Sequence, residues 1–172
     1  MRIAYADPPY LGQANKYPEK QEVDHERLIA QLESFDGWAL SCSSPSLKTI
    51  LPMCPDDIRI GAWVKSFASF KPNVNPAYVW EPVIFKPARG YERKALTIRD
   101  WIEGVITLRT GMIGAKPYYF CTWFFEILGA DYDDEFYDLF PGSGAVTRSW
   151  ESWSKCRQFN RWLKRDKSSL TQ

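Results

Sequence analysis

Four consecutive residues near the start of the chain, Asp7, Pro8, Pro9 and Tyr10, combine types that can hold a planar amino group. The two prolines lack N–H groups and fix the backbone, so the turn offers two acceptors: the Asp7 carboxylate and the Pro8 carbonyl. Tyr10 adds an aromatic face on which a ring can stack. The residues alone are equally compatible with a proline-rich turn that is capped by an aspartate.

A second candidate element lies in the segment from Asp138 to Gly144. Its Pro141-Gly142-Ser143-Gly144 turn contains two glycines that let backbone approach a ligand closely, and a helix is predicted directly after it. The turn lacks the glycine spacing of a dinucleotide-binding loop and the lysine of a phosphate-binding loop. Taken alone, it is also compatible with an ordinary turn that leads into a helix.

Both candidate elements follow apolar segments that are predicted to be strands. Strand and helix patterns alternate along the chain, which indicates a single α/β domain over residues 1–172 with a mostly parallel sheet and helices on both faces. In such a sheet, ligands bind beyond the carboxyl ends of the strands. Pro82 favours an edge position or a bulge for its strand. We predict strands at 2–6, 38–43, 58–65, 78–85 and 135–140, and helices at 24–35, 45–53, 98–103, 117–128 and 145–163.

The composition excludes several classes of protein. Of 172 residues, 45% are hydrophobic, which is enough to build a core without disulfides or a structural metal. No secretion signal is found, and no apolar stretch reaches roughly 18 residues, so we expect a cytoplasmic protein that does not span a membrane. The four cysteines show no paired spacing and there is one histidine, which predicts buried reduced thiols rather than a zinc site.

The formal net charge of +1 does not indicate a nucleic-acid partner, but the charges are unevenly distributed. The basic segments 86–99 and 155–167 are candidate phosphate contacts, and solvated surfaces explain them almost equally well. The acidic run 131–135 predicts a solvated turn rather than a metal site. His25 is expected at the surface of its helix rather than in catalysis.

The two candidate elements together resemble the amino-group methyltransferases that use S-adenosylmethionine (SAM) as cofactor. The segment Asp7–Tyr10 is similar to their catalytic motif, and the segment Asp138–Gly144 is similar to their methionine-binding turn. The catalytic motif comes first, an order that resembles the circularly permuted DNA amino-methyltransferases and the mRNA-type N6-adenosine methyltransferases. Looser similarities occur at Trp80-Glu81, Lys116-Pro117 and Trp150.

This resemblance implies a circularly permuted, Rossmann-like methyltransferase fold and a role for each matching residue. Asp7, Pro8, Pro9 and Tyr10 would be catalytic, with Asp7 and the Pro8 carbonyl holding the target amino group. Polar residues such as Gln158 and Asn160 are candidates for the cofactor ribose. The residues implied for cofactor binding are Ala6, Asp7, Lys116, Asp138, Phe140, Pro141, Gly142, Ser143 and Gly144.

The resemblance also implies methylation of adenine N6 in DNA, with RNA as the alternative, by a bacterial or phage modification enzyme. The methyl group would pass directly from sulfonium to nitrogen, so positioning and electrostatics would carry the reaction. A target base in a duplex would have to be flipped out. Segment 86–115 is a candidate target-contact insertion, and a homodimer or partner subunit is a further expectation. The candidate substrate contacts are Tyr10, Lys65, Arg89, Arg93 and Lys94.

A second hypothesis belongs to another class of function. The chain ends soon after the glycine-rich turn and contains many aromatic residues. A protein with a methyltransferase-like fold that binds nucleic acid or a partner protein, without catalysis, is compatible with both features. Binding of SAM separates the two hypotheses.

Overall fold

A computed structural model of the chain describes residues 1–16, 20–67, 72–90, 97–105 and 115–169, those after Trp162 by their backbone alone. Within these residues, six strands form one sheet in the order β5-β3-β4-β2-β1-β6. β4 is antiparallel to both of its neighbours, whereas all other pairs are parallel, so five strands end at the edge where β4 begins. The strands are β1 (Arg2–Ala6), β2 (Gly37–Ser41), β3 (Arg59–Lys65), β4 (Trp80–Lys86), β5 (Trp101–Gly104) and β6 (Glu135–Asp138).

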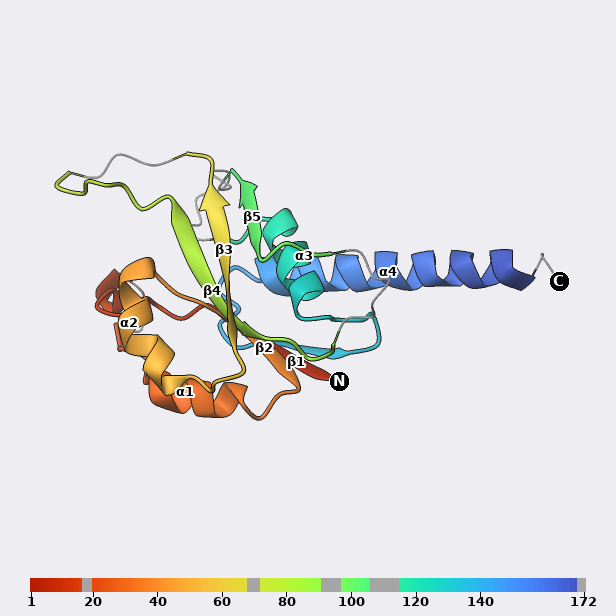
Figure 1. Ribbon diagram of the computed structural model, residues 1–172, viewed down its shortest axis with the longest axis horizontal. Helices are drawn as coiled ribbons and strands as arrows, with labels where there is room; N and C mark the ends of the chain where they lie inside the picture. Colours follow the sequence, from red (N-terminus) through yellow and green to blue (C-terminus); the bar gives the residue numbers. More distant parts are fainter. Residues whose placement is uncertain (17–19, 68–71, 91–96, 106–114, 170–172) are drawn as a thin grey trace.

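Helices cover both faces of this sheet, as expected (Figure 1). α1 (His25–Leu32) and α2 (Leu47–Ile50) pack on one face, and α3 (Tyr118–Ile127) and α4 (Ala145–Ser169) pack on the other. Short 3-10 turns flank α2 and precede α1: η1 (Ala14–Lys16), η2 (Ser44–Ser46) and η3 (Leu51–Met53).

The two faces of the sheet form two hydrophobic cores. Successive side chains of a strand point to opposite faces, so in β1 Ala4 and Ala6 belong to the core under α1, whereas Ile3 and Tyr5 belong to the core under α3. Tyr5 stacks on Phe124 of α3 at a centroid distance of 4.5 Å. Because both faces are covered, β1 and β2 are mostly apolar, which is why they are predicted well from short apolar runs.

α3 ends in a well-defined C-terminal motif. Gly129 has a φ of +67°, a left-handed conformation that glycine adopts without strain. The N–H groups of Gly129 and Ala130 donate to the carbonyls of Glu126 and Phe125, both at 3.0 Å. These two bonds satisfy carbonyls that the end of the helix would leave without partners.

α4 begins directly after the glycine-rich turn and extends beyond the body of the protein (Figure 1). Its first half packs in the aromatic core, where Trp153 is 7% exposed. Farther along the helix, Phe159 and Trp162 are each 58% exposed, and their rings stack on one another at 6.0 Å. The helix therefore has one half inside the core and one half outside it.

Most predicted elements are confirmed, with boundaries shifted by a few residues, but two predictions about strands are wrong. Residues 98–103, predicted as a helix, include most of β5, which pairs with β3 instead. Pro82 lies in an internal strand with an unbroken register, not at an edge or a bulge. Its carbonyl accepts a hydrogen bond from the N–H of Cys42 (3.1 Å), one residue after β2 ends. The N–H that proline lacks therefore falls just outside the β2 ladder.

Two predictions about which side chains are buried and which are exposed are also corrected. His25 is buried at the start of α1, and its Nδ1 forms a hydrogen bond with the carbonyl of Val23 (2.9 Å). Among the cysteines, Cys42 and Cys121 are buried as predicted, but Cys156 is exposed. His25 directly follows Asp24, the residue that caps α1. It is therefore the first residue of the helix, and its side chain is buried in the protein.

Candidate active site

The two turns predicted to carry chemistry lie side by side at the carboxyl edge of the sheet. β1 and β6 are parallel neighbours in which Tyr5 pairs with Asp138, and the N–H of Leu139 donates to the carbonyl of Tyr5 (2.9 Å). Neighbouring strands are about 5 Å apart, so the Asp7–Tyr10 turn and the Asp138–Gly144 turn leave the sheet next to each other. The predicted location of both elements beyond the strand ends is confirmed.

The Asp7–Tyr10 turn keeps its carboxylate accessible from one side. The side chain of Asp7 is 25% exposed, Pro8 is buried, and Tyr10 is half-buried. Burial raises the pKa of Tyr10; the ammonium of Lys116 counteracts this, and the carboxylate of Glu81 raises the pKa further. The Tyr10 phenol is therefore neutral.

A chain of alternating charges begins at Asp7. The Nζ atom of Lys116 lies 3.0 Å from Oδ1 of Asp7 and 2.6 Å from Oε1 of Glu81. Oε2 of Glu81 lies 2.9 Å from Nζ of Lys65. Lys116 and Glu81 are each 6% exposed, whereas Lys65 is 26% exposed. We call Asp7, Lys116, Glu81 and Lys65 the Asp7 charge chain; its members come from four separate segments.

The charges around the Asp7 charge chain shift the pKa values of its two carboxylates in opposite directions. Burial raises the pKa of Asp7 above 3.8; Lys116 counteracts this rise and Glu81 adds to it. Burial would also raise the pKa of Glu81, but the ammonium groups of Lys116 and Lys65 outweigh it and lower this pKa to about 2. Burial would lower the pKa of Lys116, but Asp7 and Glu81 hold it well above 10.5. Asp7 is therefore the carboxylate of this chain that takes up a proton first.

The glycine-rich turn after β6 leaves one buried oxygen without a partner. Gly142 and Gly144 have φ values of +45° and +71°, and the N–H of Gly144 donates to the carbonyl of Pro141 (2.6 Å). Oδ2 of Asp138 accepts a hydrogen bond from the hydroxyl of Thr147 (3.2 Å). Its buried Oδ1 has no hydrogen-bond partner among the described residues. Burial raises the pKa of Asp138, and hydrogen bonding from Thr147 and from the backbone of Phe140 partly offsets that rise.

The other predicted cofactor residues lie at the same edge. Ala6 is buried at the end of β1, Phe140 and Ser143 are half-buried in the turn, and Pro141 is exposed there. Of the predicted substrate contacts, Tyr10 and Lys65 are at this edge, whereas Arg93 and Lys94 lie outside the described residues. The two ribose candidates, Gln158 and Asn160, are exposed on α4.

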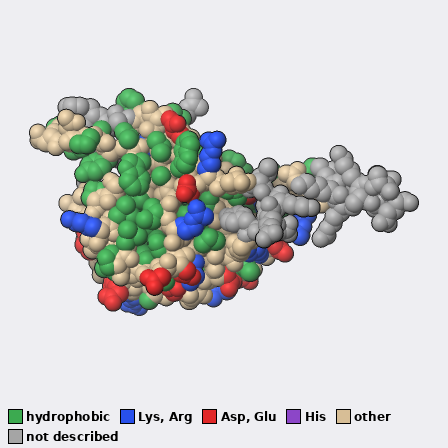
Figure 2. Space-filling view, in the orientation of Figure 1, with side chains coloured by type: hydrophobic (Ala, Val, Ile, Leu, Met, Phe, Trp, Pro, Cys, Tyr) green, Lys and Arg blue, Asp and Glu red, His purple; other side chains and the backbone are tan. Residues whose placement is uncertain are grey.

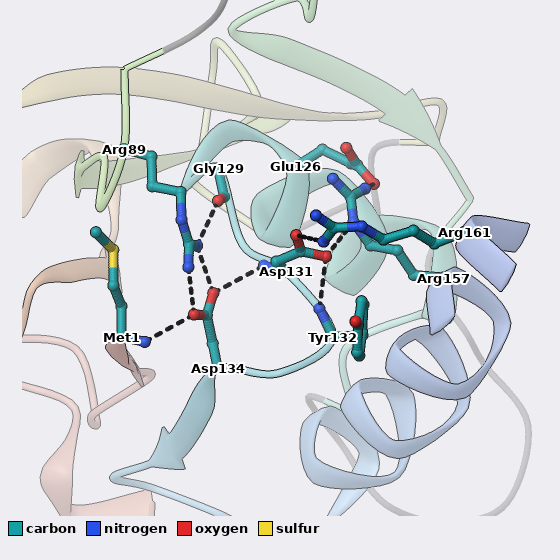
Figure 3. A network of polar contacts seen from close by, with 9 residues as sticks. All are labelled: Met1, Arg89, Glu126, Gly129, Asp131, Tyr132, Asp134, Arg157 and Arg161. Atoms are coloured by element: carbon teal, nitrogen blue, oxygen red, sulfur yellow. Dashed lines mark hydrogen bonds and ion pairs between the residues drawn. The ribbon is translucent and has the colours of Figure 1, made fainter. Parts of the chain in front are cut away.

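Arg89, also predicted as a substrate contact, lies at the opposite edge of the sheet. Figure 3 shows its guanidinium donating to Asp134, and it also donates to the carbonyl of Gly129 (2.9 Å). Asp134 directly precedes β6, so this ion pair is at the edge where β1 and β6 begin. The structure therefore does not bring Arg89 together with Asp7.

The acidic run near Asp134 is not the solvated turn that its composition predicts. Asp134 is buried beneath Arg89, and Asp131 accepts from Arg157 (3.2 Å) and Arg161 (2.6 Å) of α4 (Figure 3). The sequence pattern does not reveal this because the arginines are far away along the chain. Among the described residues, no group of His, Cys, Asp or Glu is placed to hold a metal ion.

The similarity at Trp80-Glu81 points to Glu81 in the sequence but assigns it no role in the site. Glu81 lies among apolar residues of β4, and that context is a second signal in the sequence. A carboxylate within a buried strand is costly unless it is paired, so it indicates a buried cationic partner. None of the described helices combines the length and the apolar character that crossing a membrane requires.

Comparison with known proteins identifies the fold of the chain but not its family. No family model and no curated protein matches the chain. Solved structures of similar fold include the crystal structure of the M1.HpyAVI–SAM complex, with a TM-score of 0.61 and 16% sequence identity over 88% of this chain and 77% of that chain. This similarity, together with the mixed sheet covered by helices on both faces, shows that the chain has a Rossmann-like methyltransferase fold.

Proposed function

We propose that this protein transfers a methyl group from SAM to the N6 amino group of adenine in DNA. One observation carries the proposal: an acceptor turn at Asp7 and a glycine-rich turn after Asp138 leave neighbouring strands of a methyltransferase-like sheet. Amino methylation needs these two parts, a holder for the amino group and a cradle for the methyl donor. The solved structure of similar fold is a complex with SAM, which supports the choice of cofactor.

The residues after β6 fit this cofactor. SAM carries an ammonium group, and the buried Oδ1 of Asp138, which has no partner among the described residues, is an acceptor of the matching charge. Gly142 and Gly144 present backbone without side chains, and α4 begins at Ala145 with N–H groups that can take a carboxylate. When bound, SAM supplies a methyl group that is activated by a positively charged sulfur. Further residues of this cradle would be Ala6, Phe140, Pro141 and Ser143.

The residues of the first turn would hold and polarise the amino group. The carboxylate of Asp7 and the carbonyl of Pro8 each accept one of its two N–H bonds, which directs the nitrogen lone pair away from both acceptors. Positive charge develops on this nitrogen during transfer, and the nearby carboxylate stabilises it. The proton can leave afterwards, so no strong general base is required. Tyr10 would stack on the ring of the base.

Exposed aromatic residues at the same edge support a nucleic acid as substrate. Figure 2 shows hydrophobic side chains gathered over β3 and β4. Phe67 follows β3, Tyr78 and Trp80 lie at the beginning of β4, and all three are exposed. The side chain of Lys65, which is 26% exposed, lies in the same region. Aromatic faces beside a cation are suited to unpaired bases and their phosphates.

The order of the motifs supports a finer assignment. The acceptor turn follows the first strand of the chain and the cofactor turn follows β6, the last one described. We therefore propose that the protein belongs to the circularly permuted class of bacterial or phage DNA methyltransferases. A homodimer or a partner subunit would then contribute to target selection.

The test is methyl transfer from SAM with a deuterated methyl group to unmodified DNA, followed by mass spectrometry of the nucleosides. Single-stranded DNA, duplex DNA and RNA of the same sequence form parallel arms. We expect labelled N6-methyladenine in a DNA arm, and we expect Asp7→Asn to lower the rate at least about 100-fold. Asp133→Asn, which changes an exposed carboxylate away from the site, is the matched control and should keep the wild-type rate.

The outcomes separate the candidate functions. Label in RNA alone would replace DNA by RNA as substrate. A wild-type rate no higher than that of Asp7→Asn in every arm would contradict methyl transfer. Calorimetry would then decide the alternative, because a protein that binds nucleic acid without catalysis, and without this cofactor, releases no heat with SAM.

A further inference from the structure

Lys116 occupies a position that the proposed chemistry alone does not explain. Its Nζ atom is buried next to two carboxylates and beside the rings of Trp63 and Phe120, whose centroids are 5.5 and 5.7 Å away. Removing an ammonium group from water is costly unless close opposite charges compensate for it. Among the described residues, Lys116 forms ion pairs with the carboxylates of Asp7 and Glu81, and these contacts fix its position.

We propose that Lys116, anchored by Glu81, is a positioning residue for Asp7; this rests on the function proposed above. Lys116 engages Oδ1 of Asp7, so the carboxylate cannot rotate freely and Oδ2 remains to accept an N–H bond of the substrate. The shorter contact, with Glu81, also holds Lys116 in place. Lys116 thus acts through Asp7, whereas the family resemblance implies a direct contact with the cofactor.

Lys65 completes the Asp7 charge chain. Its positive charge makes the chain neutral, which explains how the chain can be buried. The chain contains two carboxylates and two ammonium groups, so its formal charges cancel. Removing Lys116 leaves Asp7 and Glu81 as two close negative charges, whereas removing the charge of Glu81 leaves an excess of positive charge beside Asp7. The two changes therefore act on Asp7 with opposite sign.

The charged groups around Asp7 act on its pKa, so the direction of each change can be measured as a pKa shift. Lys116 favours the ionised carboxylate, whereas Glu81 on β4 and Asp138 on β6 disfavour it, and burial raises the pKa of Asp7 overall. The two phenols that face Asp7 have raised pKa values, so they are neutral in the acidic range. Among the described residues, the titratable groups that face Asp7 are Lys116, Glu81, Asp138, Tyr5, Tyr10 and Cys121.

The experiment is a pH titration of Asp7 in the intact protein by carbon NMR of labelled aspartate carboxyl groups, with Asp7→Asn to assign the signal. We expect Lys116→Met to raise the pKa of Asp7 by about one unit or more and Glu81→Gln to lower it. Lys116→Arg keeps the charge and should leave the pKa near the wild-type value. Lys86→Met, which removes a lysine at the other end of β4, is the matched control and should shift nothing.

The pH dependence of methyl transfer supplies the second readout. The acid limb of the rate should move to higher pH in Lys116→Met and to lower pH in Glu81→Gln, with the affinity for SAM within about twofold of the wild type. A purely structural role would lower the rate without moving the limb in opposite directions. Unchanged NMR titrations in both variants, or a loss of SAM affinity in Lys116→Met without a shift at Asp7, would overturn the proposal.

The proposal can still be tested if Lys116→Met does not fold or if the wild type transfers no methyl group. If Lys116→Met does not fold, the lowered pKa of Asp7 expected in Glu81→Gln is compared with the unchanged pKa expected in Lys116→Arg, and equal titrations in these two variants count against the proposal. If the wild type transfers no methyl group, the NMR shifts still test the positioning of Asp7. Shifts without transfer would refute the proposed function and retain the coupling between Lys116 and Asp7.

Discussion

Asp134 is a buried carboxylate whose charge is compensated by three neighbours. It accepts hydrogen bonds from the guanidinium of Arg89, the N–H of Asp131 (2.7 Å) and the amino group of Met1 (2.8 Å) (Figure 3). Burial would raise its pKa, but these bonds outweigh that effect and lower the pKa to about 2. Because this value lies below the ordinary 3.8, Asp134 stabilises the fold above pH 3.8 and loses this contribution as the pH falls toward 2.

We therefore predict that Asp134→Asn lowers the free energy of unfolding at pH 7 by about 2 kcal/mol, and that this difference from the wild type shrinks between pH 4 and pH 2. Urea unfolding at a series of pH values measures it. Asp133→Asn changes the exposed neighbouring carboxylate and should follow the wild type throughout. A difference that stays constant between pH 4 and pH 2 would contradict the prediction.

At the residue level, the sequence predicts Asp7 and Asp138 better than the ion pairs that connect Asp7 to Lys116, Glu81 and Lys65. Asp7 stands out because two prolines follow it, and Asp138 because a glycine-rich turn does; both signals are local. Glu81 and Lys65 lie in strands whose pairing is set by tertiary structure, and no local pattern matches them to Lys116. The sequence thus predicts which residues carry the proposed chemistry, but not which residues hold them in place.

Among the elements, α3 depends on one glycine for its ending. Gly129→Ala would place a side chain at a φ of +67° and a Cβ atom 3.3 Å from Cβ of Arg89. We predict a loss of about 1–2 kcal/mol in the free energy of unfolding, measured with urea. Gly90→Ala is the matched control, because a Cβ atom there meets nothing within 4 Å, and its effect should be within about 0.5 kcal/mol. Equal losses in the two variants would show that the left-handed conformation is not the cause.

The predicted elements were right where a local signal determines them and wrong where a partner does. The run at β1 and the capped pattern of α1 are read correctly, because apolar runs and an N-terminal aspartate act locally. The segment at β5 has apolar residues that suit either a helix or a strand, and its pairing with β3 decides. Pro82 is tolerated in an internal strand only because β2 ends opposite it, which no pattern within β4 reveals.

In the whole molecule, the Asp7 charge chain and the ionic cluster around Asp134 lie at opposite edges of the sheet and serve different purposes. The Asp7 charge chain joins four segments at the carboxyl edge, beside the glycine-rich turn. The cluster around Asp134 joins the turn before β6 to α4 at the other edge, through Asp131 and the arginines of α4. α4 thus links the two edges: it starts at the proposed cofactor turn and is held by the acidic turn farther along.

This arrangement predicts that the two halves of α4 contribute very differently to stability. Trp153 is 7% exposed, packs against Phe125 (5.3 Å) and Trp150 (5.2 Å), and donates from Nε1 to Glu126 (3.2 Å). Trp153→Ala should therefore lower the free energy of unfolding by about 3–5 kcal/mol in urea titrations. Because α4 begins at the glycine-rich turn, this variant should also weaken SAM binding in calorimetry.

Trp162→Ala is the matched variant on the projecting half of the same helix. Trp162 is 58% exposed and contacts the ring of Phe159 within its own helix, so its removal should change the free energy of unfolding by less than about 0.5 kcal/mol. SAM binding should keep its wild-type affinity. A loss of stability that approaches that of Trp153→Ala would mean that the projecting half is covered in solution, for instance by a second copy of the chain. The loss would then depend on protein concentration, which the same titrations would reveal.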